Sequence, residues 1–125
     1  MRVLETLKIL EEAVLDSKIR DIDTPEVREA LDLLDPHCSP KWHVEGFRVS
    51  LRHDRRSGAE LEGQQQVLRV YFGGIYRSVR ALLDEQIGKL GGRYAKTKDK
   101  TVKAEIDRLT TALSQMPDRW DFRVR

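Results

Sequence analysis

The feature that most constrains this chain is a heptad pattern between residues 59 and 90. Apolar residues recur there seven positions apart, with others at the intermediate positions: Leu61, Leu68, Ile75 and Leu82, then Phe72 and Val79. Such a repeat places one apolar stripe along a helix. We therefore predict one long helix over 59–90, which would extend roughly 45 Å. A helix that long in a small chain is expected to pack on another subunit or to project.

Three further helices are predicted. The first covers about 2–19, because Val3, Leu7, Leu10 and Val14 are spaced by four, three and four. The second begins at Thr24-Pro25-Glu26, an N-cap followed by proline in the first turn, and is stopped by Asp35-Pro36. The last begins at Thr101 and ends before Pro117, and Gly91-Gly92 is expected to stop the long helix.

Two segments alternate with the two-residue period of a half-buried strand. In 46–52, Phe47, Val49 and Leu51 alternate with polar residues, and 120–124 repeats the pattern with Trp120, Phe122 and Val124. Because a lone strand leaves its backbone groups unpaired, a small two-stranded ribbon joining 46–52 with 120–124 is predicted. In the connection before it, Trp42 and Val44 are expected to turn inward.

The predicted fold class is mainly α. Aromatic residues make up 6% of the chain, which suits a core of aliphatic side chains between helices. At 125 residues the chain is expected to form one helical domain over 1–125. We predict a four-helix bundle-like domain with a long hairpin, in which 59–90 and the last helix flank a basic loop from Arg93 to Lys103.

Composition also indicates the cellular compartment in which the chain is expected. Cys38 is the single cysteine, so it has no internal disulfide partner, and Glu5, Lys8 and Glu11 interrupt the first apolar residues. No apolar run approaches the roughly 20 residues of a membrane-spanning helix. We expect a cytoplasmic protein with no membrane contact.

Basic residues concentrate in the later part of the chain. Residues 1–45 carry 6 Lys and Arg against 11 Asp and Glu, whereas 46–125 carry 17 against 10. This asymmetry indicates either attraction between the two parts or an anionic partner. On the long helix, a basic strip lies beside Gly73-Gly74, and the following loop is basic as well. The predicted nucleic-acid-binding residues here are Arg69, Tyr76, Arg77, Arg80, Arg93, Lys96 and Lys98, with Lys100 and Lys103 nearby.

A second basic cluster lies in and after the predicted strand and could extend the same surface. It comprises Arg48, Arg52, His53, Arg55 and Arg56. The alternative for both clusters is a solvated face, with tight helix packing at the glycines and charge protecting a strand edge.

Arg48 and His53 have an Arg-x4-His spacing, which resembles the catalytic pair of HEPN ribonucleases, small helical proteins that often act as toxins or defence nucleases. The resemblance implies that Arg48 holds the scissile phosphate and His53 moves the proton. In that family the pair sits at a helix end and usually acts across a dimer, whereas here the alternation predicts a strand.

Other chemistry is not supported by the sequence. His37, Cys38 and His43 are close together, but no fourth ligand accompanies them, so no metal site is predicted. Neighbouring residues on an extended chain point apart, which argues against Cys38 as a nucleophile activated by His37. No phosphate-binding loop is present, and no cofactor is expected.

The leading hypothesis is a non-enzymatic helical subunit that contacts a nucleic-acid backbone, or a larger complex, through a basic helix face. Small helical subunits of antiviral ribonucleoprotein complexes share this shape and charge. A metal-independent HEPN-like ribonuclease is one alternative, and a structural or regulatory protein-interaction module is another. A homo-oligomer or a subunit of a complex is expected because of the long helix.

Overall fold

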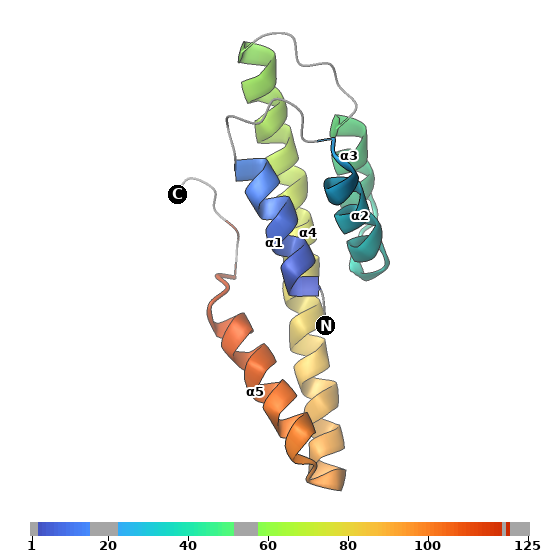
Figure 1. The fold of residues 1–125 in the computed structure, drawn as a ribbon, viewed down its shortest axis with the longest axis vertical. Helices are drawn as coiled ribbons and strands as arrows, with labels where there is room; N and C mark the ends of the chain where they lie inside the picture. The colour runs from blue at the N-terminus through green and yellow to red at the C-terminus, as the bar shows by residue number, and fades with distance from the viewer. Residues whose placement is uncertain (1–2, 16–22, 52–57, 119, 121–125) are drawn as a thin grey trace. The chain divides into compact units, whose positions relative to one another are not determined.

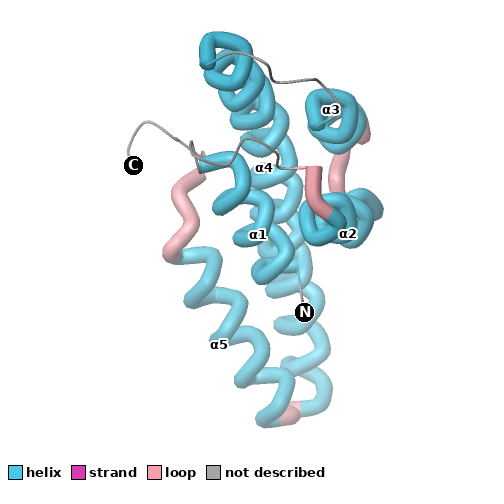
Figure 2. Tube along the Cα trace, turned by 45° about the horizontal axis from the view of Figure 1, so that its top comes forward, coloured by secondary structure: helices cyan, strands magenta, loops and turns pink. Residues whose placement is uncertain are grey.

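The computed structural model describes residues 3–15, 23–51, 58–118 and 120, without the side chains of 58–65. Within these ranges every regular element is helical, and the predicted mainly α class is confirmed (Figures 1 and 2). The elements are α1 (Val3–Leu15), α2 (Pro25–Leu34), the short 3-10 helix η1 (Asp35–His37), α3 (Trp42–Leu51), α4 (Gly58–Thr97) and α5 (Lys100–Ser114). The four-helix bundle and the long hairpin stay predictions.

The chain divides into two compact units. The first comprises 1–79 with 120–125, and the second comprises 80–119, so the boundary falls within α4, between Val79 and Arg80. Each unit has its own buried apolar residues. The single domain over 1–125 stays a prediction. No helix among the described residues is both long and apolar enough to cross a membrane.

The first two helices form where their sequence patterns predict, although residues 2 and 16–19 of the first predicted helix lie outside the described residues. The apolar stripe of α1 is buried at Val3, Leu7, Leu10 and Val14, and α1 packs on α2. Thr24 caps α2, because its hydroxyl accepts a hydrogen bond from the Val27 N–H at 3.2 Å. The helix ends at Leu34, before the predicted stop, and η1 follows.

Residues 46–51 are helical, so the prediction of a strand over 46–52 is wrong. Val44, Phe47 and Leu51 are spaced by three and four and are buried, whereas Val49 is 55% exposed. A strand would have put Val49 on the same face as Phe47 and Leu51. The alternation was therefore a by-product of an amphipathic helix. Of the predicted partner strand 120–124, residues 121–124 lie outside the described part of the chain.

Two glycines set the close packing of α3 against α4. A methyl group added at Gly74 would lie closer than 3.0 Å to the His43 ring, and one at Gly46 would overlap the ring of Tyr71. The backbones approach each other closely only because both positions lack a side chain. Trp120 completes this unit: its ring packs edge-on against Phe72, and its Nε1 donates to Glu11 at 3.0 Å.

The helix α4 is longer than predicted, because Gly91-Gly92 does not end it. Leu90 and Tyr94 are half-buried and continue the apolar pattern past the two glycines. The residue that leaves the helix is Lys98, with φ 55°. Glycine permits a left-handed C-terminus without requiring one, and here both glycines keep helical geometry.

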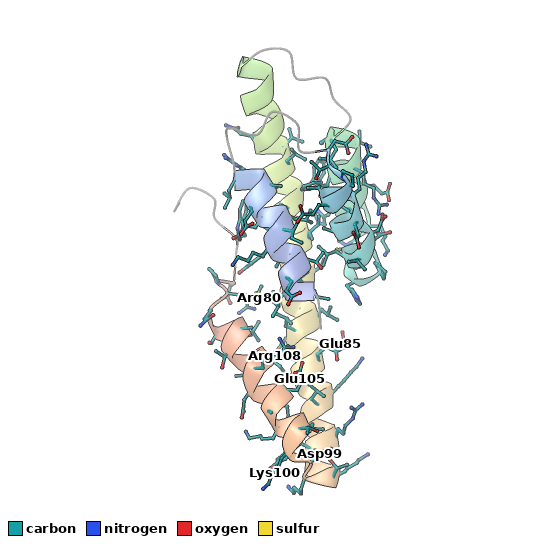
Figure 3. All side chains as sticks on the ribbon, in the orientation of Figure 1. Arg80, Glu85, Asp99, Lys100, Glu105 and Arg108 are labelled. Atoms are coloured by element: carbon teal, nitrogen blue, oxygen red, sulfur yellow. The ribbon has the colours of Figure 1, made fainter. Side chains whose placement is uncertain are left out.

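The second unit contains the end of α4 together with α5. Leu83, Val102 and Leu109 are buried within it. Arg80 joins α4 to the segment that follows α5, because its guanidinium lies 2.8 Å from the Asp118 carboxylate and its Nε donates to the Met116 carbonyl at 3.4 Å. Figure 3 shows Arg80 at the beginning of this part of α4, and Asp99 and Lys100 where α5 begins.

Candidate functional site

Among the described residues, exposed basic side chains concentrate around the connection between α4 and α5. We call it the α4–α5 cluster: Arg93, Lys96, Lys98, Lys100 and Lys103, all exposed. The segment 89–103 contains six basic residues and one acidic residue, Asp99. The basic loop predicted from Arg93 to Lys103 is in fact short, since only Lys98 and Asp99 lie outside the helices. Four of the five cations therefore project from helices rather than from a loop.

The connection is held by a compact hydrogen-bond network. The Lys98 N–H donates to the Tyr94 carbonyl at 2.8 Å, which closes α4. The Asp99 carboxylate accepts from the backbone N–H of Thr101 at 2.9 Å and from its hydroxyl at 2.7 Å, which caps α5. These two hydrogen bonds, that from the hydroxyl foremost, lower the pKa of Asp99. The segment's one carboxylate is thus committed to the helix N-terminus.

Few cations of the α4–α5 cluster form an ion pair with a carboxylate of the described residues. Lys103 pairs with Asp107 at 3.1 Å, and the Lys98 ammonium lies 5.3 Å from the centre of the Tyr94 ring. For Arg93, Lys96 and Lys100 no ion pair with any described residue is found. Positive charges in the first turn of a helix oppose its dipole, yet α5 begins with Lys100 and Lys103 and has no acid in its first turn.

Other arginines of the second unit are already engaged. Arg80 is paired with Asp118, and Arg108 binds Glu105 at 2.6 Å. Lys89 pairs with Glu85 at 3.0 Å. These pairs satisfy the cations locally, so they contribute less to binding an external anion than the α4–α5 cluster does.

The basic strip predicted along α4 is only partly available. Tyr76 is 4% exposed and belongs to the core of the first unit, so its ring has no open face for stacking. Arg69 is half-buried, and Arg77 is exposed. Arg80 belongs to the second unit and is paired with Asp118 there.

The second predicted cluster is described only at Arg48. Arg52, His53, Arg55 and Arg56 lie outside the described residues. Arg48 sits in the last turn of α3, where its guanidinium pairs with Asp32 at 2.7 Å, with Glu45 at 3.4 Å and with Asp35 at 3.9 Å. Three carboxylates therefore neutralise this arginine.

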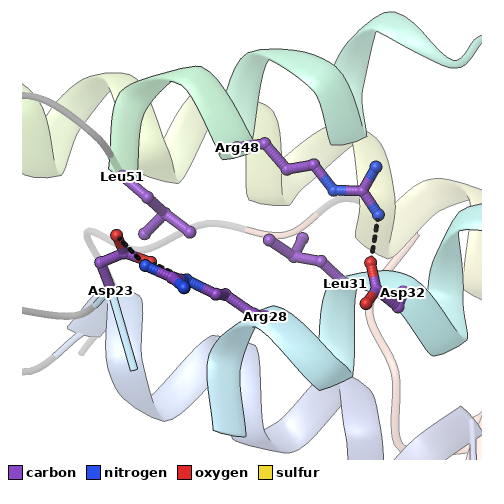
Figure 4. A pocket seen from close by; sticks show the side chains of 6 residues that line it. All are labelled: Asp23, Arg28, Leu31, Asp32, Arg48 and Leu51. Carbon is purple, nitrogen blue, oxygen red and sulfur yellow. Dashed lines mark hydrogen bonds and ion pairs between the residues drawn. The ribbon is translucent and has the colours of Figure 1, made fainter. Parts of the chain in front are cut away.

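Arg48 also lines a cavity of about 430 Å³ between α2 and α3, together with Asp23, Arg28, Leu31, Asp32 and Leu51 (Figure 4). Arg28 and Asp23 form a two-pronged pair across it, at 2.6 and 2.7 Å. The guanidinium groups of Arg28 and Arg48 are paired with the carboxylates of Asp23 and Asp32, and Leu31 and Leu51 supply the apolar part of the lining. The cavity is thus electrically balanced and offers no unpaired charge to an anion.

Cys38 has the environment of an inert thiol. It is buried, and burial, with the nearby Asp35 carboxylate, raises its pKa to about 11. The thiolate needed for nucleophilic attack or for zinc binding is therefore disfavoured. Among the described residues no group of three His, Cys, Asp or Glu side chains is placed to hold a metal ion.

Sequence reasoning missed the surroundings of Trp42. Its ring was expected to turn inward with Val44, but Trp42 is 56% exposed while Val44 is buried. The ring lies 3.8 Å from that of His43 and 6.0 Å from that of Tyr71, measured between centroids. The helical spacing of Val44, Phe47 and Leu51 was the signal that would have placed Trp42 outside.

Compared with known proteins, the chain matches no described family, no curated protein and no solved structure.

Proposed function

We propose that the chain is a non-enzymatic binding subunit whose α4–α5 cluster contacts the phosphate backbone of a nucleic acid without reading its sequence. The observation that carries the proposal is the set of three exposed cations, Arg93, Lys96 and Lys100, for which the described residues supply no carboxylate. Lysine and arginine at such positions bind phosphates and release counterions, which supplies most sequence-independent affinity.

The geometry at the start of α5 supports the same ligand. A helix N-terminus attracts anions through its dipole, although in α5 the Asp99 cap already accepts the Thr101 N–H. Lys100 and Lys103 add positive charge there, at a position where an acidic residue would stabilise the helix. This arrangement costs about 0.3–1 kcal/mol per charge in the absence of an anion. A phosphate bound beside the turn would remove that cost.

The test compares two double variants that remove the same net charge from the second unit. Lys96→Gln/Lys100→Gln removes unpaired cations, whereas Lys89→Gln/Arg108→Gln removes cations that are paired with Glu85 and Glu105. Binding to mixed-sequence RNA and DNA is measured by fluorescence anisotropy across a salt series. We expect the first variant to lower the slope of log K against log salt by roughly 1.4–1.8.

The matched variant should change that slope much less. Equal effects of the two variants would mean that only net charge matters and would remove the α4–α5 cluster from consideration. Failure of the unmodified chain to bind any nucleic acid at low salt would end the proposal altogether.

A metal-independent ribonuclease is the second candidate, and one observation favours it. Arg48 lies in the last turn of α3, the helix-end position in which the HEPN pair is found, rather than on the strand that the sequence predicted. The Asp32 pairing must open before Arg48 can hold a phosphate. RNA cleavage in the presence of a chelator, compared between the unmodified chain and His53→Ala, decides the matter: no cleavage by either chain removes this candidate.

A further inference from the structure

A patch of large apolar side chains is exposed on the first unit. We call it the α3–α4 patch: Trp42 and Val49 on α3, and Val67 and Val70 on α4. Trp42, Val49 and Val70 are each more than half exposed, with Val70 at 65%. Apolar groups clustered in this way commonly mark an interaction surface.

The packing of α3 on α4 fixes how the patch is laid out. His43 lies against Gly74, and Gly46 lies against Tyr71, so residue numbers rise along α3 as they fall along α4. The two helices are therefore antiparallel in this unit. It follows that Trp42 lies at the end of the patch nearest Arg77, and Val49 lies at the end nearest Val67 and Val70.

Gly73 is half-buried on α4, three residues from Val70 and therefore on the same side of the helix. Its neighbour Gly74 is explained by the His43 ring, but no described atom lies within 4 Å of a methyl group built at Gly73. Glycine is unfavourable within a helix unless a close approach requires it. The packing of the described chain supplies no such approach at Gly73, whereas a second helix laid over the patch would.

We propose that the α3–α4 patch is covered by a second copy of this chain, related by a two-fold axis parallel to α3 and α4. Under that symmetry α3 of each copy packs on α4 of the other. Residues at the same height along the axis then face each other. Val49 then packs on Val67 and Val70 of the second copy. The same surface meets itself, as a two-fold interface requires.

Charge complementarity supports this occupant. The same symmetry sets Trp42 over Arg77 of the second copy, and an arginine stacks favourably on an indole face. Glu45, one helical turn from Trp42, is already paired with Arg48 of its own chain, so the stacking of Arg77 on Trp42 is the contact that this symmetry offers. The open position at Gly73 lets the two helices approach.

A nucleic acid fits the patch less well. Three of its four side chains are valines, which offer no ring on which a base could stack. The inference is independent of the proposed function, because every residue of the patch belongs to the first unit and the α4–α5 cluster belongs to the second.

The test measures self-association by sedimentation equilibrium of the full chain, from low micromolar to tens of micromolar. We expect the unmodified chain to dimerise reversibly, and Val70→Glu and Val49→Glu each to weaken dimerisation by more than about tenfold. Leu33→Glu is the matched control. Leu33 is exposed to 43% on α2, outside the patch, and this variant should dimerise normally.

Gly73→Leu gives a second measurement that does not depend on inserting a charge. In the single chain the Cβ of this leucine meets no described atom within 4 Å and the leucine replaces a poor helix former, so helix content by circular dichroism should be kept or raised. In the dimer it blocks the approach of α3, so association should weaken. A dimer that tolerates Gly73→Leu would overturn the arrangement.

Two further outcomes would also overturn it. One is an unmodified chain that stays monomeric at tens of micromolar. The other is a Trp42→Ala variant that loses nucleic-acid binding without any change in association state, which would identify the patch as a base-stacking surface. Because the variants of Lys96 and Lys100 are scored separately by salt dependence, loss of this inference and loss of the proposed function can be told apart.

Discussion

The imidazole ring of His43 lies against the backbone of α4 at Gly74, where any side chain would occupy the same space. His43 is 5% exposed, and its Nδ1 is buried without a hydrogen-bond partner among the described residues. This contact joins the first turn of α3 to the middle of α4. It fixes the register between the two helices and explains one of the two glycines that interrupt a strong helical pattern.

Substitution of the two adjacent glycines should have opposite effects on stability. Gly74→Ala forces a methyl group into the His43 ring and should destabilise the chain by about 1–3 kcal/mol, as overpacking does. Gly73→Ala adds a methyl group in open space and should stabilise the helix by up to about 1 kcal/mol. Urea unfolding of the two variants measures the difference. Equal effects would show that the His43 contact does not form.

The stability of the chain should fall as the pH drops below about 6.5. Burial, and secondarily the charge of Arg77, lower the pKa of His43 below its ordinary value of 6.5. Between the lowered pKa and 6.5 the unfolded chain binds a proton that the folded chain does not, so stability rises with pH across that window. Arg77 on α4 is the charged group that opposes protonation here.

The measurement for this prediction is the difference in unfolding free energy between the unmodified chain and His43→Phe, from pH 5 to 8. The phenylalanine variant keeps a ring against Gly74 but lacks the titrating group, so its pH dependence should be weaker. His37 and His53 remain in both chains and cancel in the difference. Parallel pH profiles would contradict the prediction.

Cys38 should react slowly with alkylating reagents while the chain is folded. Its thiol is buried and its pKa is raised to about 11, so little thiolate exists at pH 8. Alkylation by iodoacetamide, followed by mass spectrometry, should speed up sharply in urea at the concentration that unfolds the chain. Rapid modification under native conditions would show that the thiol is accessible.

The charge of Asp99 can be separated from its capping role. Asparagine is as good an N-cap as aspartate, so Asp99→Asn should keep the Thr101 hydrogen bonds and the stability of α5. It removes the acidic charge within 89–103, and binding to nucleic acid at fixed salt should strengthen. Asp99→Ala is the comparison: it removes the same charge but should destabilise α5 by about 0.5–2 kcal/mol. Thermal unfolding and anisotropy titrations distinguish the two variants.

The sequence predicted the helical class and most helix boundaries because those depend on local chemistry. Thr24 and Pro25 mark the beginning of α2 without any tertiary information. The prediction of a strand at 46–52 was wrong because a short apolar run fits the period of a helix as well as that of a strand. The exposure of Val49 in the structure decides for the helix. Burial was also predicted the wrong way round for two aromatic residues, because Tyr76 is buried and Trp42 is exposed. Which ring is buried depends on where α3 packs, and the contacts at Gly46 and Gly74 that fix this packing are visible only in the structure.

The candidate site was predicted in part. The basic residues of the α4–α5 cluster are visible as composition, but their separation into paired and unpaired cations is not. Arg48 and Arg80 look as available in the sequence as Arg93 does, yet both are engaged by carboxylates. Ion pairs such as that between Arg80 and Asp118 join residues far apart in the chain, which no local pattern indicates.

The two lysines that open α5 have a consequence for how binding and folding are linked. Positive charge at the N-terminus of a helix promotes fraying of that end, and a bound polyanion would neutralise the charge and stabilise the helix. Binding of a polyanion should then raise the melting temperature of the chain. The chain would unfold at a higher temperature with heparin present, and this increase would vanish as sodium chloride is added.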